Sequence, residues 1–145
     1  MYINNIKNLV LYKKLAIFLF FIMFLYSGIN KIFNFNKKTS NLQNKIGMSF
    51  NICAFGMILV ILLETIGTLI LYYYYFINNK HDKIHKKYIN LIYILFLLFV
   101  VVVTFIYHPP NDKIIPFLSN LTTFAGILYL YMGFISDSIQ YVLNK

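Results

Sequence analysis

The sequence predicts an all-α integral membrane protein that folds as a bundle of four transmembrane helices. Of its 145 residues, 60% are hydrophobic and only 12% are charged, whereas a soluble domain carries about 25% charged residues. The apolar residues gather into runs of about 20, the length that an α-helix needs to cross a bilayer. In lipid, a helix satisfies its own backbone hydrogen bonds. A single domain, residues 1–145, accounts for this length.

Four apolar runs are expected to form the spans. They cover about residues 15–33, 52–75, 88–107 and 115–135. Lysines precede the first run as in a signal peptide, but its length and the lack of an A-x-A site favour a retained helix. The third run is rich in Val, but its length favours a helix over a strand. Pro109 and Pro110 are expected to end it.

Two polar segments connect these spans at opposite faces of the membrane. Residues 34–51 are rich in Lys and Asn and are expected to form an exposed loop. Residues 78–87 contain His81 and His85, whose i, i+4 spacing on a helix suits a metal. Four lysines lie among them and only Asp82 adds a ligand, so a solvated basic loop is favoured and no metal site is expected.

The lysines also predict the orientation of the chain. Thirteen lysines and no arginine give a net charge of +9. Eight lie near the termini or in residues 78–87. Four lie on the other side, in residues 34–51 and in the connection after the third run, and Lys31 lies at the membrane edge. Because cytoplasmic loops carry the excess of basic residues, both termini of this multi-pass membrane protein are predicted to be cytoplasmic. The lysines flank spans, so the lipid bilayer, and not nucleic acid, is the expected partner.

Glu64 is the residue that is hardest to place in a membrane, because it lies near the middle of the second span. Inserting a charged carboxylate at this depth costs roughly 2.5–3.5 kcal/mol of free energy. It must be protonated, paired or directed into a polar cavity. At about 100° per residue, Gly56, Gly67 and Thr68 fall on the same side of the helix as Glu64. Small residues let helices approach closely, so Glu64 is expected to face a neighbouring helix.

Three other polar residues lie in the same half of the membrane. Lys31 ends the first span, His108 ends the third, and Asn120 lies near the start of the fourth. Glu64 is expected to pair with Lys31, with Asn120 donating to the carboxylate and His108 extending the network outward. This network either joins the helices or forms a small-molecule or proton site open to the outside. His108 beside two prolines favours a helix-end residue over a catalytic base, and no catalytic residue is assigned.

Three short motifs resemble the DoxX family. Residues 24–33, Phe-Leu-Tyr-Ser-Gly-Ile-Asn-Lys-Ile-Phe, resemble the small-Gly-x-x-Lys ending of its first helix. Residues 63–67, Leu-Glu-Thr-Ile-Gly, are similar to its E-x-x-G motif, and residues 117–121, Phe-Leu-Ser-Asn-Leu, followed by Gly126, are similar to its F-x-x-N-L entry to the fourth helix. The resemblance covers roughly residues 14–131. By position, Lys31, Glu64 and Asn120 match the polar motif residues of the family.

The resemblance implies a four-helix membrane bundle, and some members of the family are small subunits of quinone-linked oxidoreductases or associate with redox enzymes. This chain departs from the family in its Lys- and Asn-rich first connection and in its lack of arginine. We expect an accessory membrane subunit, redox-linked through a partner protein, with a polar pocket around Glu64. One alternative is a subunit with its own oxidoreductase activity that binds a quinone or small lipid. Another is a small transporter acting as a homo-oligomer. No cofactor is evident, and a quinone is the candidate.

Overall fold

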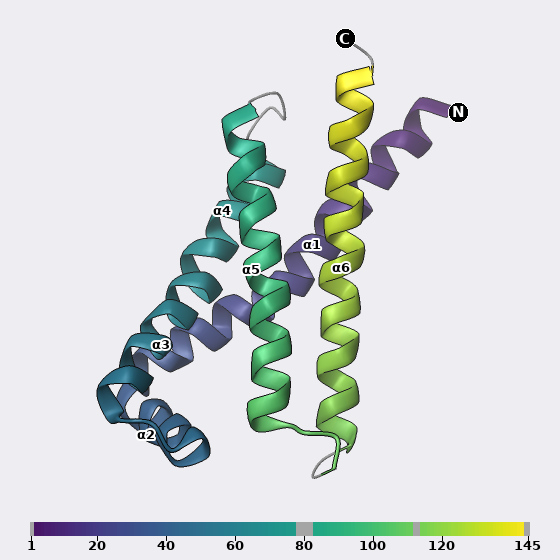
Figure 1. Cartoon of the computed structure of the whole chain (residues 1–145). Helices are drawn as coiled ribbons and strands as arrows, with labels where there is room; N and C mark the ends of the chain where they lie inside the picture. Colours follow the sequence, from purple (N-terminus) through teal and green to yellow (C-terminus); the bar gives the residue numbers. More distant parts are fainter. Residues whose placement is uncertain (1, 78–82, 112–113, 144–145) are drawn as a thin grey trace.

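The computed structural model describes residues 2–77, 83–111 and 114–143, without the side chains of residues 2–10, 83–85 and 140–142. Nearly all of this part of the chain is helical (Figure 1). In chain order the helices are α1 (Tyr2–Phe33), α2 (Phe35–Ile46), α3 (Phe50–Leu62), the π-helix η1 (Leu63–Gly67), α4 (Thr68–Phe76), α5 (Lys83–Tyr107) and α6 (Ile114–Leu143).

Within the described part of the chain, four segments are long and apolar enough to cross a membrane, which confirms the predicted fold class. They are Leu11–Phe33, Phe50–Phe76, Lys86–Tyr107 and Ile114–Ile139. The start of α1 and the end of α6 lie at one end of the bundle, which we call the terminal end (Figure 1). Helix α2 lies at the other end, which we call the α2 end.

Two pairs of helices make up the bundle. Helix α1 packs along α3, η1 and α4, and α5 packs antiparallel to α6. Pro109 and Pro110 follow the last residue of α5 in the turn towards α6, as expected from the sequence. Phe96 of α5 joins the two pairs, because its ring meets those of Phe21 and Phe24 of α1 edge-on, with centroids 5.3 and 4.9 Å apart.

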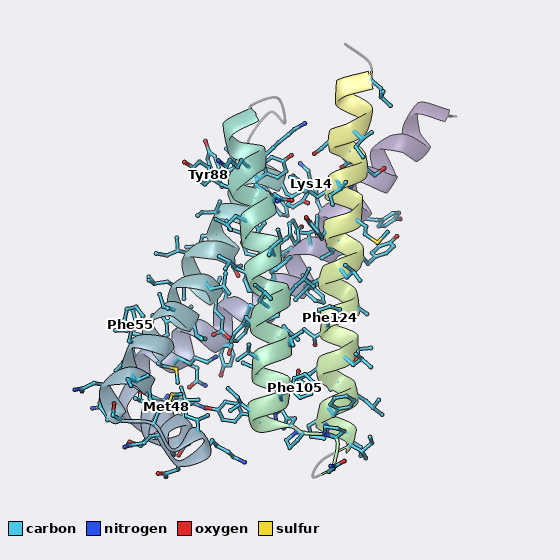
Figure 2. All side chains as sticks on the ribbon, viewed as in Figure 1. Lys14, Met48, Phe55, Tyr88, Phe105 and Phe124 are labelled. Carbon is cyan, nitrogen blue, oxygen red and sulfur yellow. The ribbon has the colours of Figure 1, made fainter. Side chains whose placement is uncertain are left out.

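The outer surface of the bundle is apolar. Phe55 of α3 projects away from the other helices and is 65% exposed (Figure 2). Tyr129 of α6 is 79% exposed. Helices that are apolar on their outer as well as their inner faces fit a lipid environment, in which exposure of these side chains carries no hydrophobic penalty. The long apolar helices and this surface indicate a multi-pass membrane protein.

The second span is not the continuous α-helix that the sequence predicts. Its middle turn, Leu63–Gly67, is a π-helix and contains Glu64. A π-turn adds a residue to the helix and changes the direction in which the following side chains point, and such turns are frequent at functional sites. Next to Glu64, the Thr65 hydroxyl donates to the Ile61 carbonyl oxygen over 2.7 Å, within the stretch where the regular hydrogen-bond ladder is interrupted.

The connection at residues 34–51 is not the loop that its polar composition suggested, because α2 occupies most of it. Thr39, Leu42 and Ile46 follow Phe35 at the spacing of one helix face, and Thr39 is fully buried. Gly47 then ends the helix with a left-handed backbone (φ 70°), which glycine adopts without strain. Helix α2 thereby packs its apolar face against α3 and α5.

Candidate functional site

Lys31 and Glu64 form an ion pair between α1 and η1. The Lys31 Nζ lies 2.8 Å from Oε1 and 2.6 Å from Oε2 of Glu64, so the ammonium bridges both carboxylate oxygens. The Glu64 side chain is only 2% exposed and that of Lys31 is 18% exposed. The expected pairing is therefore present, and Lys31 extends inward instead of towards the nearer membrane surface.

Ser27 closes the network around this pair. Its hydroxyl accepts a hydrogen bond from Lys31 Nζ at 2.6 Å and donates to Glu64 Oε1 at 3.3 Å. Ser27 and Lys31 are one turn apart on α1, which places them on the same face. A lysine ammonium has three N–H donors. All three are used here, so Lys31 is held in place and has no donor left for another group.

Gly28 allows the close approach on which the pair depends. A Cβ at this position would lie 2.7 Å from Cγ2 of Thr65 and 3.0 Å from Cβ of Glu64. Real Cβ atoms are essentially never 2.7 Å from another heavy atom, so any larger residue would force Thr65, Glu64 or the helix backbones to shift. Lys31 is three residues further along α1 and reaches Glu64 because this contact has no side chain in it.

A pocket of about 580 Å³ lies beside the ion pair, in the half of the bundle near the α2 end. Segments of α1, α2, α3, α5 and α6 form its walls, together with Glu64 of η1. Most of the lining is apolar, including Met23, Met57, Val60 and Val103. Small-molecule pockets are typically about 300–1,000 Å³, mainly apolar and supplied with a few polar groups. The pocket has all three properties.

The pocket also exposes polar groups that lie apart from the ion pair. Asn120 of α6 and Lys38 and Asn41 of α2 line it. The structure shows no hydrogen bond from these three side chains to any described residue. They are therefore donors available to a bound molecule. Lys38 and Asn41 are absent from the sequence-based site because residues 34–51 were expected to form a loop. The amphipathic spacing of α2 is the signal that places them.

The four predicted site residues do not all meet. Lys31, Glu64 and Asn120 line one pocket, but Asn120 donates no hydrogen bond to the Glu64 carboxylate. His108 does not belong to the lining, and its Nδ1 is buried without a hydrogen-bond partner among the described residues. Tyr107 lines the pocket instead. His108 follows Tyr107, the last residue of α5, and its side chain lies outside the pocket.

The expectation about metals is tested only in part. Within residues 2–77, 83–111 and 114–143, no three His, Cys, Asp or Glu side chains gather. His81 lies outside the described residues, and the side chain of His85 is not described. The spacing of these two histidines therefore stays a sequence observation.

The chemistry of the site follows from these contacts. The ion pair supplies a fixed dipole on one wall, and the free amides and Lys38 supply donors on two others. Such a pocket can orient an apolar molecule with a hydrogen-bond-accepting end. Comparisons with protein-family models, with curated proteins and with solved structures give no match to this chain. The resemblance to the DoxX family therefore stays a prediction.

Proposed function

We propose that this chain is an accessory subunit of a membrane complex, of the DoxX type, and that it binds a small membrane-soluble molecule in the pocket beside Glu64. The observation that carries the proposal is that the buried ion pair lies on the wall of a cavity. A pair that only joined helices would be expected to pack without leaving a space of about 580 Å³ next to it.

The energetic cost of the ion pair supports a role beyond packing. Burying two charges removes them from water, and apolar residues of similar size often serve stability equally well or better. Small residues already bring α1 and η1 together at Gly28. A fixed, fully hydrogen-bonded dipole in the pocket wall is instead suited to orienting a ligand.

A quinone or a small lipid fits the lining of the pocket. Its carbonyl or head group would accept from Asn120 and Lys38, and its chain would lie against the methionines and valines of the walls. If the ligand is a quinone, electron transfer is assigned to the partner protein that the resemblance to the DoxX family implies. This chain would then hold and orient the molecule.

The proposal includes an orientation. Both ends of the chain approach the same end of the bundle (Figure 1), and the lysine bias assigns that end to the cytoplasm. The pocket would then lie in the outer half of the membrane, on the side of α2. A ligand would enter from the outer leaflet or from the water above it.

Extraction with a pocket-filling variant tests the proposal. Gly56 lines the pocket, and a Cβ added there meets no atom within 4 Å. Gly56, Val60 and Glu64 are four residues apart and share a face, so the side chain of Gly56→Leu should occupy part of the pocket. The wild type should retain a small molecule through purification from membranes in mild detergent, as detected by mass spectrometry, and Gly56→Leu should lose it.

Ala125→Leu is the matched control, because Ala125 is exposed on α6 and does not line the pocket. It should retain the same molecule as the wild type. Equal recovery of every small molecule from all three proteins would contradict ligand binding in this pocket. The same purification identifies any partner protein, and the absence of a stoichiometric partner would remove the accessory-subunit part of the proposal.

A further inference from the structure

The charges that line the pocket do not balance. Among the described residues, the charged side chains of the lining are Lys31, Lys38 and Glu64, so two lysines face a single carboxylate there. Glu64 is engaged by Lys31 through both of its oxygens. The described lining therefore offers no free carboxylate to pair with Lys38.

Lys31 and Lys38 differ in the state of their donors. Each N–H of Lys31 has an acceptor, in Ser27 or Glu64. Lys38 is partly buried and forms no hydrogen bond or ion pair with any described residue. A partly buried ammonium without an acceptor gains more from an anion than an exposed one does, because water competes less for it.

We infer that the pocket binds a single-chain amphiphile with a carboxylate head group, and that Lys38 holds this carboxylate. This inference rests on the proposed function, since it assumes that the pocket is a ligand site. One carboxylate would leave the pocket neutral. A phosphate monoester, with nearly two negative charges, would leave an excess of negative charge beside Glu64, which is costly in an apolar environment.

The size and lining of the pocket agree with one chain instead of two. Its volume of about 580 Å³ falls in the range of drug-sized ligands. Met23, Met57 and the valines of α5 provide the apolar walls for the chain. Asn41 and Asn120 add amide N–H groups that can donate hydrogen bonds to a carboxylate.

Helix α2 offers a route of entry for such a molecule. Its sequence contains three lysines and no acidic residue. Lys37 and Lys45 are exposed, while Lys38 is turned to the pocket. Basic helices at the membrane surface attract anionic amphiphiles, so the helix that attracts the head group also carries the lysine that receives it.

Equilibrium binding of two labelled probes of equal chain length tests the inference. The protein is held in an uncharged detergent, and the probes are radiolabelled palmitate and hexadecanol. The wild type should bind palmitate more tightly than hexadecanol. Lys38→Gln should weaken palmitate binding about tenfold or more, because the ammonium that pairs with the carboxylate is replaced by a neutral amide, whose hydrogen bond is weaker. It should leave hexadecanol binding unchanged.

Two variants control for other effects of the substitution. Lys38→Arg keeps the charge and should keep the preference for palmitate. Lys37→Gln removes a neighbouring charge that does not line the pocket, and it should behave as the wild type. If Lys37→Gln weakens palmitate binding as much as Lys38→Gln does, general surface charge explains the preference and the inference is wrong.

The experiment separates this inference from the proposed function. Equal binding of palmitate and hexadecanol by the wild type would overturn the carboxylate assignment and leave the pocket as a site for neutral amphiphiles. Failure to bind palmitate, hexadecanol and a short-chain quinone, with no difference between the wild type and Gly56→Leu, would overturn both.

Discussion

Lys31 and Glu64 are 33 residues apart in the sequence, and the Lys31 Nζ lies 2.6 Å from Oε2 of Glu64 in the interior of a membrane bundle. Neither residue is isolated, since Ser27 contacts both. The pair links α1 to the π-turn of the second span and forms one wall of the pocket. Its contribution to stability and its proposed role in ligand orientation can be measured separately.

We expect each single neutralisation of the pair to destabilise the fold strongly. Lys31→Met leaves the Glu64 carboxylate buried without its counter-charge, with the Ser27 hydroxyl still donating to it, which costs about 3–5 kcal/mol. The double variant Lys31→Met/Glu64→Met removes both charges and should recover most of this loss. Reversible unfolding in mixed micelles measures these differences. Lys13→Met, which breaks the exposed pair with Asp137, is the control and should cost about 0–1 kcal/mol.

If the double variant is as unstable as Lys31→Met alone, the ion pair stabilises the fold by more than is needed to offset the cost of burying its two charges. If it is stable but fails to retain the small molecule found with the wild type, the pair acts chiefly on the ligand. The second result is the one we expect. Retention of the molecule by the double variant would show that the dipole is not needed for binding.

Gly28→Ala should disturb the same contact through packing alone. The added methyl group meets Thr65 Cγ2 at 2.7 Å, and overpacking of this kind costs about 1–3 kcal/mol. Thr65→Ser removes that carbon and should recover part of the stability in the Gly28→Ala background. Gly56→Ala is the matched control, since its methyl group meets nothing within 4 Å. Thermal unfolding in detergent is the measurement, and equal effects of the two alanines would contradict the close approach of α1 and η1.

Much of this architecture can be predicted from the sequence, because hydropathy reports depth in a membrane. It gives the four spans, the intramembrane position of Glu64 and the level of Lys31 near it. Hydropathy does not tell with the same accuracy which side of a helix a given side chain lies on. Depth alone therefore predicts that His108 lies near Glu64, whereas the structure places Tyr107 on the pocket instead.

Two local features could not be read from composition. The π-turn at Leu63–Gly67 depends on a single extra residue, which an average over apolar residues does not detect. Most residues of α2 are polar, and this composition predicts a loop. Its helical signal is the spacing of Phe35, Thr39, Leu42 and Ile46, and this spacing also brings Lys38 to the pocket.

At the terminal end, Tyr75 and Tyr93 should depend on each other. Their hydroxyl groups are 2.9 Å apart and buried, between α4 and α5. Changing either one to Phe leaves the other hydroxyl without this partner and should cost about 1 kcal/mol. The double Phe variant should cost less than the sum of the single changes. Unfolding in mixed micelles measures this coupling, and Tyr129→Phe, at an exposed position, serves as the control. Strict additivity would show that the hydrogen bond contributes nothing.

The orientation is open to a labelling test. In a Cys53→Ser background, Lys37→Cys places a thiol on the exposed face of α2 and Lys87→Cys places one near the terminal end. A membrane-impermeant maleimide added to intact cells should label position 37 and not position 87. Permeabilised cells provide the control, in which both should react. Labelling of position 87 alone in intact cells would show that the protein has the opposite orientation, with the pocket in the cytoplasmic half of the membrane.

Photoaffinity labelling is the most direct test that the pocket beside Glu64 holds a membrane-soluble molecule. A hexadecanol carrying a diazirine is neutral, so its binding does not depend on the charge of Lys38. After irradiation in vesicles, we expect cross-links in residues 56–64, 99–107 and 119–123, which contribute lining side chains. Gly56→Leu should reduce them and Ala125→Leu should not. Cross-links confined to lipid-facing positions such as Phe55 and Tyr129, and equal in all three proteins, would contradict the proposed site.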